Sequence, residues 1–201
     1  MSGHTSLTPW ENTMKRILGL VAVFCLPATA LAQSGAAPSG DLSYTYAGLR
    51  FVDFDDNGGD GLRIEGSYDL GNNWIIVGEY TGADFNNNVD VNWFEIGGGY
   101  VWSYTSDWDL VGTARFVSAD ADTPGGSSDE TGFRLSGGLR GLLMPKFEIR
   151  GSVNYINLDS SDTYLELAGD YYFTQRFSAG LSIEFAGDTD LFSVGARYYF
   201  R

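Results

Sequence analysis

The side chains that most often carry covalent chemistry are almost absent from this sequence. Its one cysteine, Cys25, and its one histidine, His4, both lie near the N-terminus. Serine and aspartate nucleophiles usually rely on a histidine as general base, and a thiolate nucleophile requires cysteine. Pairs of glutamate and aspartate would suit glycoside hydrolysis, but the sequence indicates no cleft around them. We therefore predict no catalytic site and no cofactor.

One acidic segment has the spacing of a cation site. Asp53, Asp55 and Asn57 precede Gly58 in the order D-x-D-x-N-G, which matches the first half of a helix-flanked calcium loop. The match ends at the twelfth position, where Ile64 replaces the usual glutamate. Aspartate, asparagine and glycine are also common in simple turns. The segment is therefore either an ordinary turn or a loose Ca²⁺ site.

The elements that would position these residues are strands. From residue 42 onward the sequence has no helical period and contains short runs of alternating residues separated by Gly, Asn, Asp, Ser and Pro. Each run is about long enough to cross a bilayer when tilted. We expect a bulge at Ala47-Gly48, where the alternation of the first run breaks. The ten predicted strands cover residues 42–53, 62–70, 74–83, 91–104, 108–119, 131–143, 146–157, 163–174, 177–186 and 190–200.

Each run has one apolar face and one polar face. In the second run, Leu62 and Ile64 alternate with Arg63 and Glu65. If the apolar face contacts lipid, the polar face lines a narrow lumen, where arginines and carboxylates should pair. The pairs would form either a plug or a narrow polar pore. The charged residues expected there are Arg63, Glu65, Asp69, Glu79, Glu95, Arg115, Arg134, Arg140, Glu148, Arg150, Glu166, Asp170, Glu184 and Arg197. Inward-facing glycines would free some volume, namely Gly97, Gly99, Gly138, Gly180 and Gly195.

The connections differ at the two ends of these runs. At one end the links are tight, and aromatic residues such as Trp74, Trp102 and Tyr171 gather beside them. Short periplasmic turns, longer outer loops and an aromatic girdle are typical of outer-membrane barrels. Residues 42–201 are therefore predicted to form an all-β, ten-stranded antiparallel up-and-down transmembrane β-barrel. The longer links, which hold aspartate and glutamate but no lysine or arginine, are residues 53–61, 83–90, 119–130, 158–162 and 187–190.

The N-terminal region has the features of an export signal. A basic pair precedes a short apolar run and then the small residues Ala30-Leu31-Ala32. This order predicts a signal peptide, residues 1–32, that is cleaved after Ala32. Met14 stands where such a peptide normally begins, so we expect translation to start there. Residues 33–41 would then be a flexible leader before the barrel.

The charge of the chain bears on its partners. Acidic residues outnumber basic ones by 26 to 12. Nucleic-acid binding needs cationic patches, so we expect no nucleic-acid partner. Acidic outer loops would attract divalent cations, which could bridge them to anionic lipopolysaccharide. The expected partners are outer-membrane lipid, lipopolysaccharide and, during insertion, the barrel-assembly machinery.

The last run ends in a distinctive pattern. Gly195, Tyr198 and Phe200 hold the defining positions of polar-x-Gly-x-x-aromatic-x-aromatic. This pattern resembles the C-terminal signal by which outer-membrane β-barrels are recognised and inserted. It differs in one respect, because Arg201 follows the final aromatic residue.

Two further resemblances concern the family. The segment Leu42-Ser43-Tyr44-Thr45-Tyr46, the Asp-rich turn and the following Gly-Leu-Arg-Ile-Glu-Gly-Ser sequence resemble the opening of small xanthomonad outer-membrane barrels once named sulfation-dependent quorum factors. More generally, the chain is similar to OmpA-like and porin-like barrels. The first resemblance implies a secreted signal modified on tyrosine, at Tyr44 or Tyr46. The alternation instead predicts that both tyrosines face lipid or lie at the rim.

These observations leave two hypotheses for a non-enzymatic protein of the Gram-negative outer membrane. The first is a structural barrel or narrow pore for small solutes, with a lumen lined by arginines and carboxylates. The second is a surface adhesion or interaction protein that acts through acidic, cation-binding outer loops.

Overall fold

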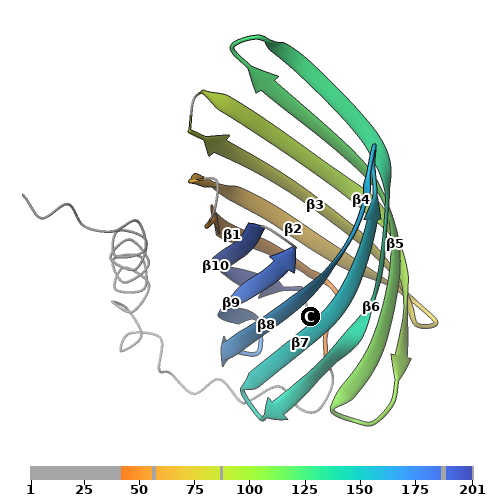
Figure 1. Ribbon diagram of the computed structural model, residues 1–201. Helices are drawn as coiled ribbons and strands as arrows, with labels where there is room; N and C mark the ends of the chain where they lie inside the picture. The colour runs from red at the N-terminus through yellow and green to blue at the C-terminus, as the bar shows by residue number, and fades with distance from the viewer. Residues whose placement is uncertain (1–41, 56–57, 87, 187–188, 201) are drawn as a thin grey trace, which may run out of the picture. The chain divides into compact units, whose positions relative to one another are not determined.

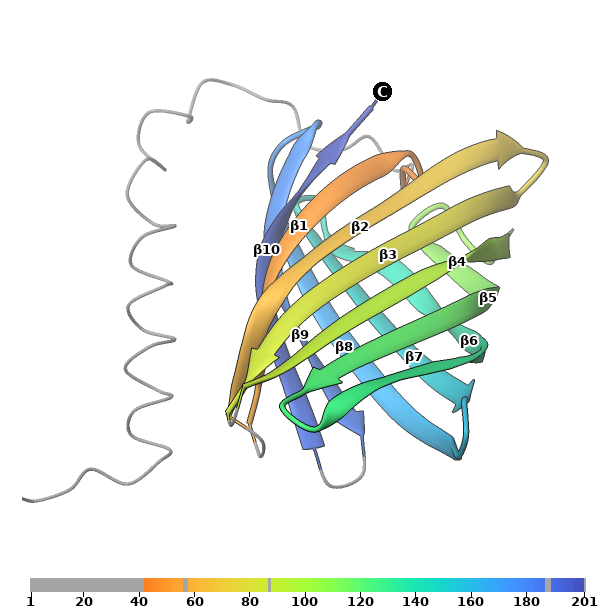
Figure 2. The same cartoon turned by 90° about the horizontal axis from the view of Figure 1, so that it is seen from above.

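The computed structural model describes residues 42–55, 58–86, 88–186 and 189–200, which form one closed antiparallel sheet. Each strand pairs with its sequence neighbours, and β1 pairs with β10 to close the barrel (Figures 1 and 2). The predicted fold is therefore confirmed. No helix in this part of the chain is long and apolar enough to cross a membrane. The strands are β1 (Tyr46–Phe54), β2 (Gly59–Gly71), β3 (Trp74–Phe85), β4 (Val89–Ser103), β5 (Trp108–Thr123), β6 (Gly126–Met144), β7 (Phe147–Asn157), β8 (Ser161–Thr174), β9 (Phe177–Ala186) and β10 (Thr189–Tyr199).

The two faces of the sheet follow the alternation of the sequence. On β2, Leu62 and Ile64 are exposed on the outside, whereas Arg63 between them is buried in the lumen. A closed sheet pairs its backbone groups internally, which is what a lipid environment requires of an all-β structure. The apolar outer surface and the closed backbone hydrogen bonding therefore both suit a lipid bilayer.

The two ends of the barrel are named here by the chain ends. The terminal end holds the start of β1 and the end of β10, and the opposite end is the distal end. At the terminal end, β2 and β3 are joined by Asn72 and Asn73, whose φ angles are 53° and 69°. Asparagine tolerates this left-handed conformation, which two-residue hairpin turns require.

The first strand differs from its prediction. Tyr46 to Phe54 pair residue for residue with both neighbouring strands, so the predicted bulge at Ala47-Gly48 is wrong. The register shifts occur instead on β2, β6 and β8, beside turns of the terminal end. Since the pairing is regular, Tyr46 lies on the lumen face together with Arg50, and the expected lipid-facing or rim position of Tyr46 is also wrong.

The distal connections are shorter than expected, whereas the turns at the terminal end are tight as predicted. The connections run two to four residues at both ends of the barrel, because the strands extend into the segments predicted as distal loops. Strand β6, for example, begins at Gly126, and β5 ends at Thr123; their hairpin is the green one at the top of Figure 1. The acidic residues of these segments therefore lie largely on paired strands rather than on free loops.

The inward-facing glycines have a role beyond the one predicted. A Cβ atom at Gly97 would overlap the backbone carbonyl oxygen of Ala114 on β5, and one at Gly195 would overlap that of Leu49 on β1. Glycine is required at these positions because the neighbouring strand comes too close for a side chain. They allow neighbouring strands to approach closely, and one of them, Gly138, also lines a cavity of the lumen.

Candidate functional site: the charged lumen

The terminal half of the lumen holds a buried group of charges, called the terminal network. Glu148 accepts two hydrogen bonds of 2.9 Å from Arg140 and one of 2.5 Å from the Tyr172 hydroxyl. Arg197 pairs with Glu65 at 2.5 Å. Planar guanidinium groups suit such multiple pairing, and the opposite charges nearly balance. The seven members, drawn from β1, β2, β6, β7, β8 and β10, are Arg50, Glu65, Arg140, Glu148, Arg150, Asp170 and Arg197.

A second group, called the distal network, lies nearer the opposite end. Arg63 forms ion pairs with Glu184 at 2.7 Å and with Glu79 at 3.2 Å. Glu95 is fully buried and pairs with Arg134 at 2.5 Å. Its members come from six strands, β2 to β6 and β9, and are Arg63, Glu79, Glu95, Arg115, Arg134 and Glu184.

Residues 42–45, which precede β1, lie at the terminal end, where Tyr44 enters the lumen. The Tyr44 hydroxyl donates a 2.8 Å hydrogen bond to Asp109, and the Arg140 guanidinium lies 4.5 Å from the centre of the Tyr44 ring. Tyr44 also packs against Ile75 and Val101. The prediction that Tyr44 faces lipid or the rim is therefore wrong, because its hydroxyl finds a buried carboxylate inside the barrel.

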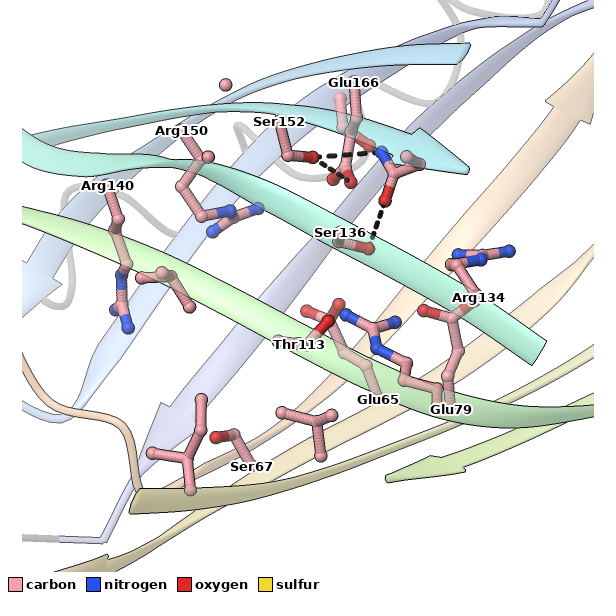
Figure 3. Close-up of a pocket in the computed structure, with 18 of the residues that line it drawn as sticks. Glu65, Ser67, Glu79, Thr113, Arg134, Ser136, Arg140, Arg150, Ser152 and Glu166 are labelled. Atoms are coloured by element: carbon pink, nitrogen blue, oxygen red, sulfur yellow. Dashed lines mark hydrogen bonds between the residues drawn. The ribbon is translucent and has the colours of Figure 1, made fainter. Parts of the chain in front are cut away.

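Three cavities follow one another along the lumen. The central cavity, of about 140 Å³, is lined by both networks and by Ser136, Ser152 and Glu166 (Figure 3). The distal cavity, of about 380 Å³, shares four lining residues with the central cavity, namely Arg63, Glu79, Arg134 and Glu184. The terminal cavity, of about 400 Å³, shares Tyr44 and Ile75 with the central cavity. Side chains alone therefore separate the three spaces.

Most of the charges assigned to the lumen from the sequence are brought together there. Two of them belong to neither network: Asp69 is exposed at the terminal end and accepts a hydrogen bond from Gly71 N–H, whereas Glu166 lines the central cavity and accepts a 3.4 Å hydrogen bond from Ser152 Oγ. Sequence reasoning missed Arg50, whose guanidinium reaches Glu65 and Asp170. Val52 and Arg50 are two residues apart, so an unbroken alternation along β1 would have placed both on the lumen face.

The residues of the C-terminal pattern occupy two faces of β10. Tyr198 and Phe200 are exposed on the outside, with their rings in an edge-to-face contact 5.1 Å apart. Gly195 faces the lumen against β1. Phe200 N–H donates to the Thr45 carbonyl at 3.0 Å, which ties the end of the chain to its first strand.

Acidic residues form a row around part of the distal end. Five aspartates on β1 to β5 stand directly opposite one another in the pairing register: Asp53, Asp60, Asp84, Asp90 and Asp122. Like charges in such positions destabilise a sheet. Of the proposed Ca²⁺ ligands, Asp53 and Asp55 lie here, and Asn57 lies outside the described residues. Within the described ranges no group of three or more acidic, histidine or cysteine side chains is arranged to hold a metal. The Ca²⁺ site and lipopolysaccharide bridging stay predictions.

The distal row should make stability depend on pH. A hydrogen bond with Asp84, reinforced by the charges of Asp84 and Asp122, raises the pKa of Asp90 above its usual value. The folded protein therefore takes up this proton more readily than the unfolded chain, so stability should rise as the pH falls through the raised pKa. We expect Asp90→Asn to be more stable than the parent protein at pH 7 and to lose this advantage in acid, measured as the urea midpoint of unfolding. Asp107→Asn, at an exposed position of the terminal end, is the control, and equal behaviour of both variants would contradict the prediction.

An antiparallel sheet that closes on itself, with an apolar outer surface and ion pairs inside, defines a transmembrane β-barrel. The model of the outer membrane protein beta-barrel domain matches residues 17–185, so the chain belongs to that family and is an outer-membrane protein. The termini of an even-stranded barrel face the periplasm, so the distal end is the outer one. The narrower resemblance to sulfation-dependent quorum factors stays a prediction.

Three solved structures illustrate the similar architecture. The KdgM porin is 14% identical, with a TM-score of 0.49, and the match covers 78% of this chain and 99% of that one. The Ail attachment invasion locus protein of Yersinia pestis is 18% identical, with a TM-score of 0.42, and the match covers 78% and 97%. For the neisserial surface protein A these values are 15%, 0.40, 78% and 96%. These likenesses concern the fold alone. No protein with a curated function matches the sequence significantly.

Proposed function

We propose that this protein is a narrow pore for small solutes in the outer membrane. The observation that carries the proposal is the series of three cavities, each of which shares lining residues with the next. A barrel filled only for stability would need no such succession of spaces.

Two layers of side chains control this path. The first, between the distal and central cavities, is the ion-paired group around Arg63. The second, between the central and terminal cavities, is Tyr44 with its contacts to Arg140 and Asp109. Passage should therefore be restricted to small solutes.

Single-channel recording tests the proposal. Full-length protein purified from outer membranes is inserted into planar lipid bilayers, and heat-modifiable migration on gels establishes that it is folded. We expect discrete conductance steps of small amplitude, because the central cavity is narrow. Silence from folded, inserted protein under all voltages and salt concentrations used would contradict a pore.

A further inference from the structure

The distal cavity has walls that a path for polar solutes does not explain. Inward-facing positions of a membrane barrel are usually polar. Here much of the wall is apolar and continues into a buried cluster of Val117, Ile156 and Tyr164. The apolar residues that line the cavity are Phe54, Ala83, Phe85, Val91, Trp93, Ile156, Ala186 and Leu191. At 380 Å³ the cavity has the size of sites for small organic ligands.

Two buried donors in this wall have no partner among the described residues. Tyr164 is only 7% exposed, and its hydroxyl makes no hydrogen bond. Arg134 uses its terminal nitrogen to pair with Glu95, but its buried Nε is unsatisfied. The Arg134 guanidinium lies 5.3 Å from the centre of the Tyr164 ring, so the two residues are neighbours. An acceptor oxygen of a ligand would satisfy donors that are costly to leave unpaired.

The charges around the cavity favour an uncharged ligand. Glu79, Glu184 and Asp162 face it together with Arg63 and Arg134. Arg63 is already paired with both glutamates, so an anion would meet three carboxylates and no free arginine. A cation would be placed beside Arg134. A neutral oxygen avoids both penalties.

We propose that the distal cavity binds a small, uncharged molecule with an aromatic or alkyl body and one carbonyl or hydroxyl oxygen. The body packs against Trp93 and the contacting rings of Phe54 and Phe85, and the oxygen accepts hydrogen bonds from Tyr164 and Arg134. This binding goes beyond conduction and does not depend on it, because the cavity lies on the outer side of the layer around Arg63.

Photo-crosslinking with benzophenone tests the site. Benzophenone is uncharged, carries two aromatic rings and one carbonyl oxygen, and on irradiation inserts into nearby C–H bonds. Full-length folded protein is titrated with it, irradiated and mapped by mass spectrometry. We expect saturable labelling around Trp93 and Ile156, which dicyclohexyl ketone competes away, because this uncharged aliphatic ketone can occupy the site without quenching the benzophenone triplet. Its anionic analogue 4-benzoylbenzoate should label these residues more weakly.

Variants connect the labelling to the proposed contacts. Tyr164→Phe should raise the half-saturating benzophenone concentration about fivefold, the usual effect of one lost hydrogen bond. Tyr155→Phe removes a hydroxyl from the lipid-facing side of β7 and should leave the concentration unchanged. Labelling confined to lipid-facing residues such as Val153, equal labelling by the anion, or equal saturation of Tyr164→Phe and the parent would each overturn the proposal. If Tyr164→Phe does not fold, the competition experiment on the parent protein tests the site instead, and labelling that the competitor does not reduce would overturn the proposal.

Discussion

Replacing Glu148 with alanine is expected to lower the free energy of unfolding by about 3–5 kcal/mol, because it leaves buried arginines without their counter-charge. Glu148 is 0% exposed and is bonded to Arg140, Arg150 and Tyr172. No other carboxylate contacts Arg140 in the ion pairs of the described residues. Urea unfolding in lipid vesicles, followed by tryptophan fluorescence, measures the loss.

A matched control removes a carboxylate that does not belong to the network. Asp159 lies in the connection between β7 and β8 and is exposed, so Asp159→Ala should change stability by no more than about 0.5 kcal/mol. Glu148→Gln keeps the volume and should fall between the two. If Glu148→Ala unfolded at the same urea concentration as the parent, water would have to reach and solvate the terminal network.

The second large effect concerns conduction, which rests on the proposed pore. Tyr44→Ala should raise the single-channel conductance several-fold, because the Tyr44 ring separates the central and terminal cavities. Tyr44 lies before β1 and makes no ladder pairs, so its truncation leaves the barrel sheet intact. The measurement is the conductance of the parent and the variant in the same bilayer and salt.

The control for this experiment is an aromatic residue of similar size outside the lumen. Tyr100 is exposed on the lipid-facing side of β4, so Tyr100→Ala should leave conductance unchanged. An equal conductance for Tyr44→Ala and the parent would mean that another layer limits the flow, and the assignment of Tyr44 would be wrong. The layer around Arg63 would then be the next to test.

The barrel could be predicted because lipid imposes a simple rule on every strand. Residues such as Leu62 and Ile64 must face outward and Arg63 inward, so period two is visible without any knowledge of contacts. Strand ends are less constrained, since an aspartate beyond the lipid can belong to a loop or to a paired strand. Residues 119–130 were therefore predicted as a loop, although most of them extend β5 and β6.

The lumen was harder to predict than the lipid-facing surface. Tyrosine suits both a membrane interface and a buried polar network, so sequence alone could not place Tyr44 and Tyr46 inside. That choice also hid Arg50, because it implied a break in β1. The unpartnered Tyr164 hydroxyl has no sequence signature, since it depends on what the facing strands leave unsatisfied.

The position of Arg197 has a consequence for the order of assembly. This residue lies on β10, which is synthesised after the other nine described strands, and its carboxylate partners Glu65, Asp170 and Glu148 lie on β2, β8 and β7. Until β10 docks against β1, these carboxylates lack one of their cations in a membrane that penalises unpaired charge. We therefore expect closure of the sheet and neutralisation of the interior to occur together, so that an unclosed intermediate is short-lived.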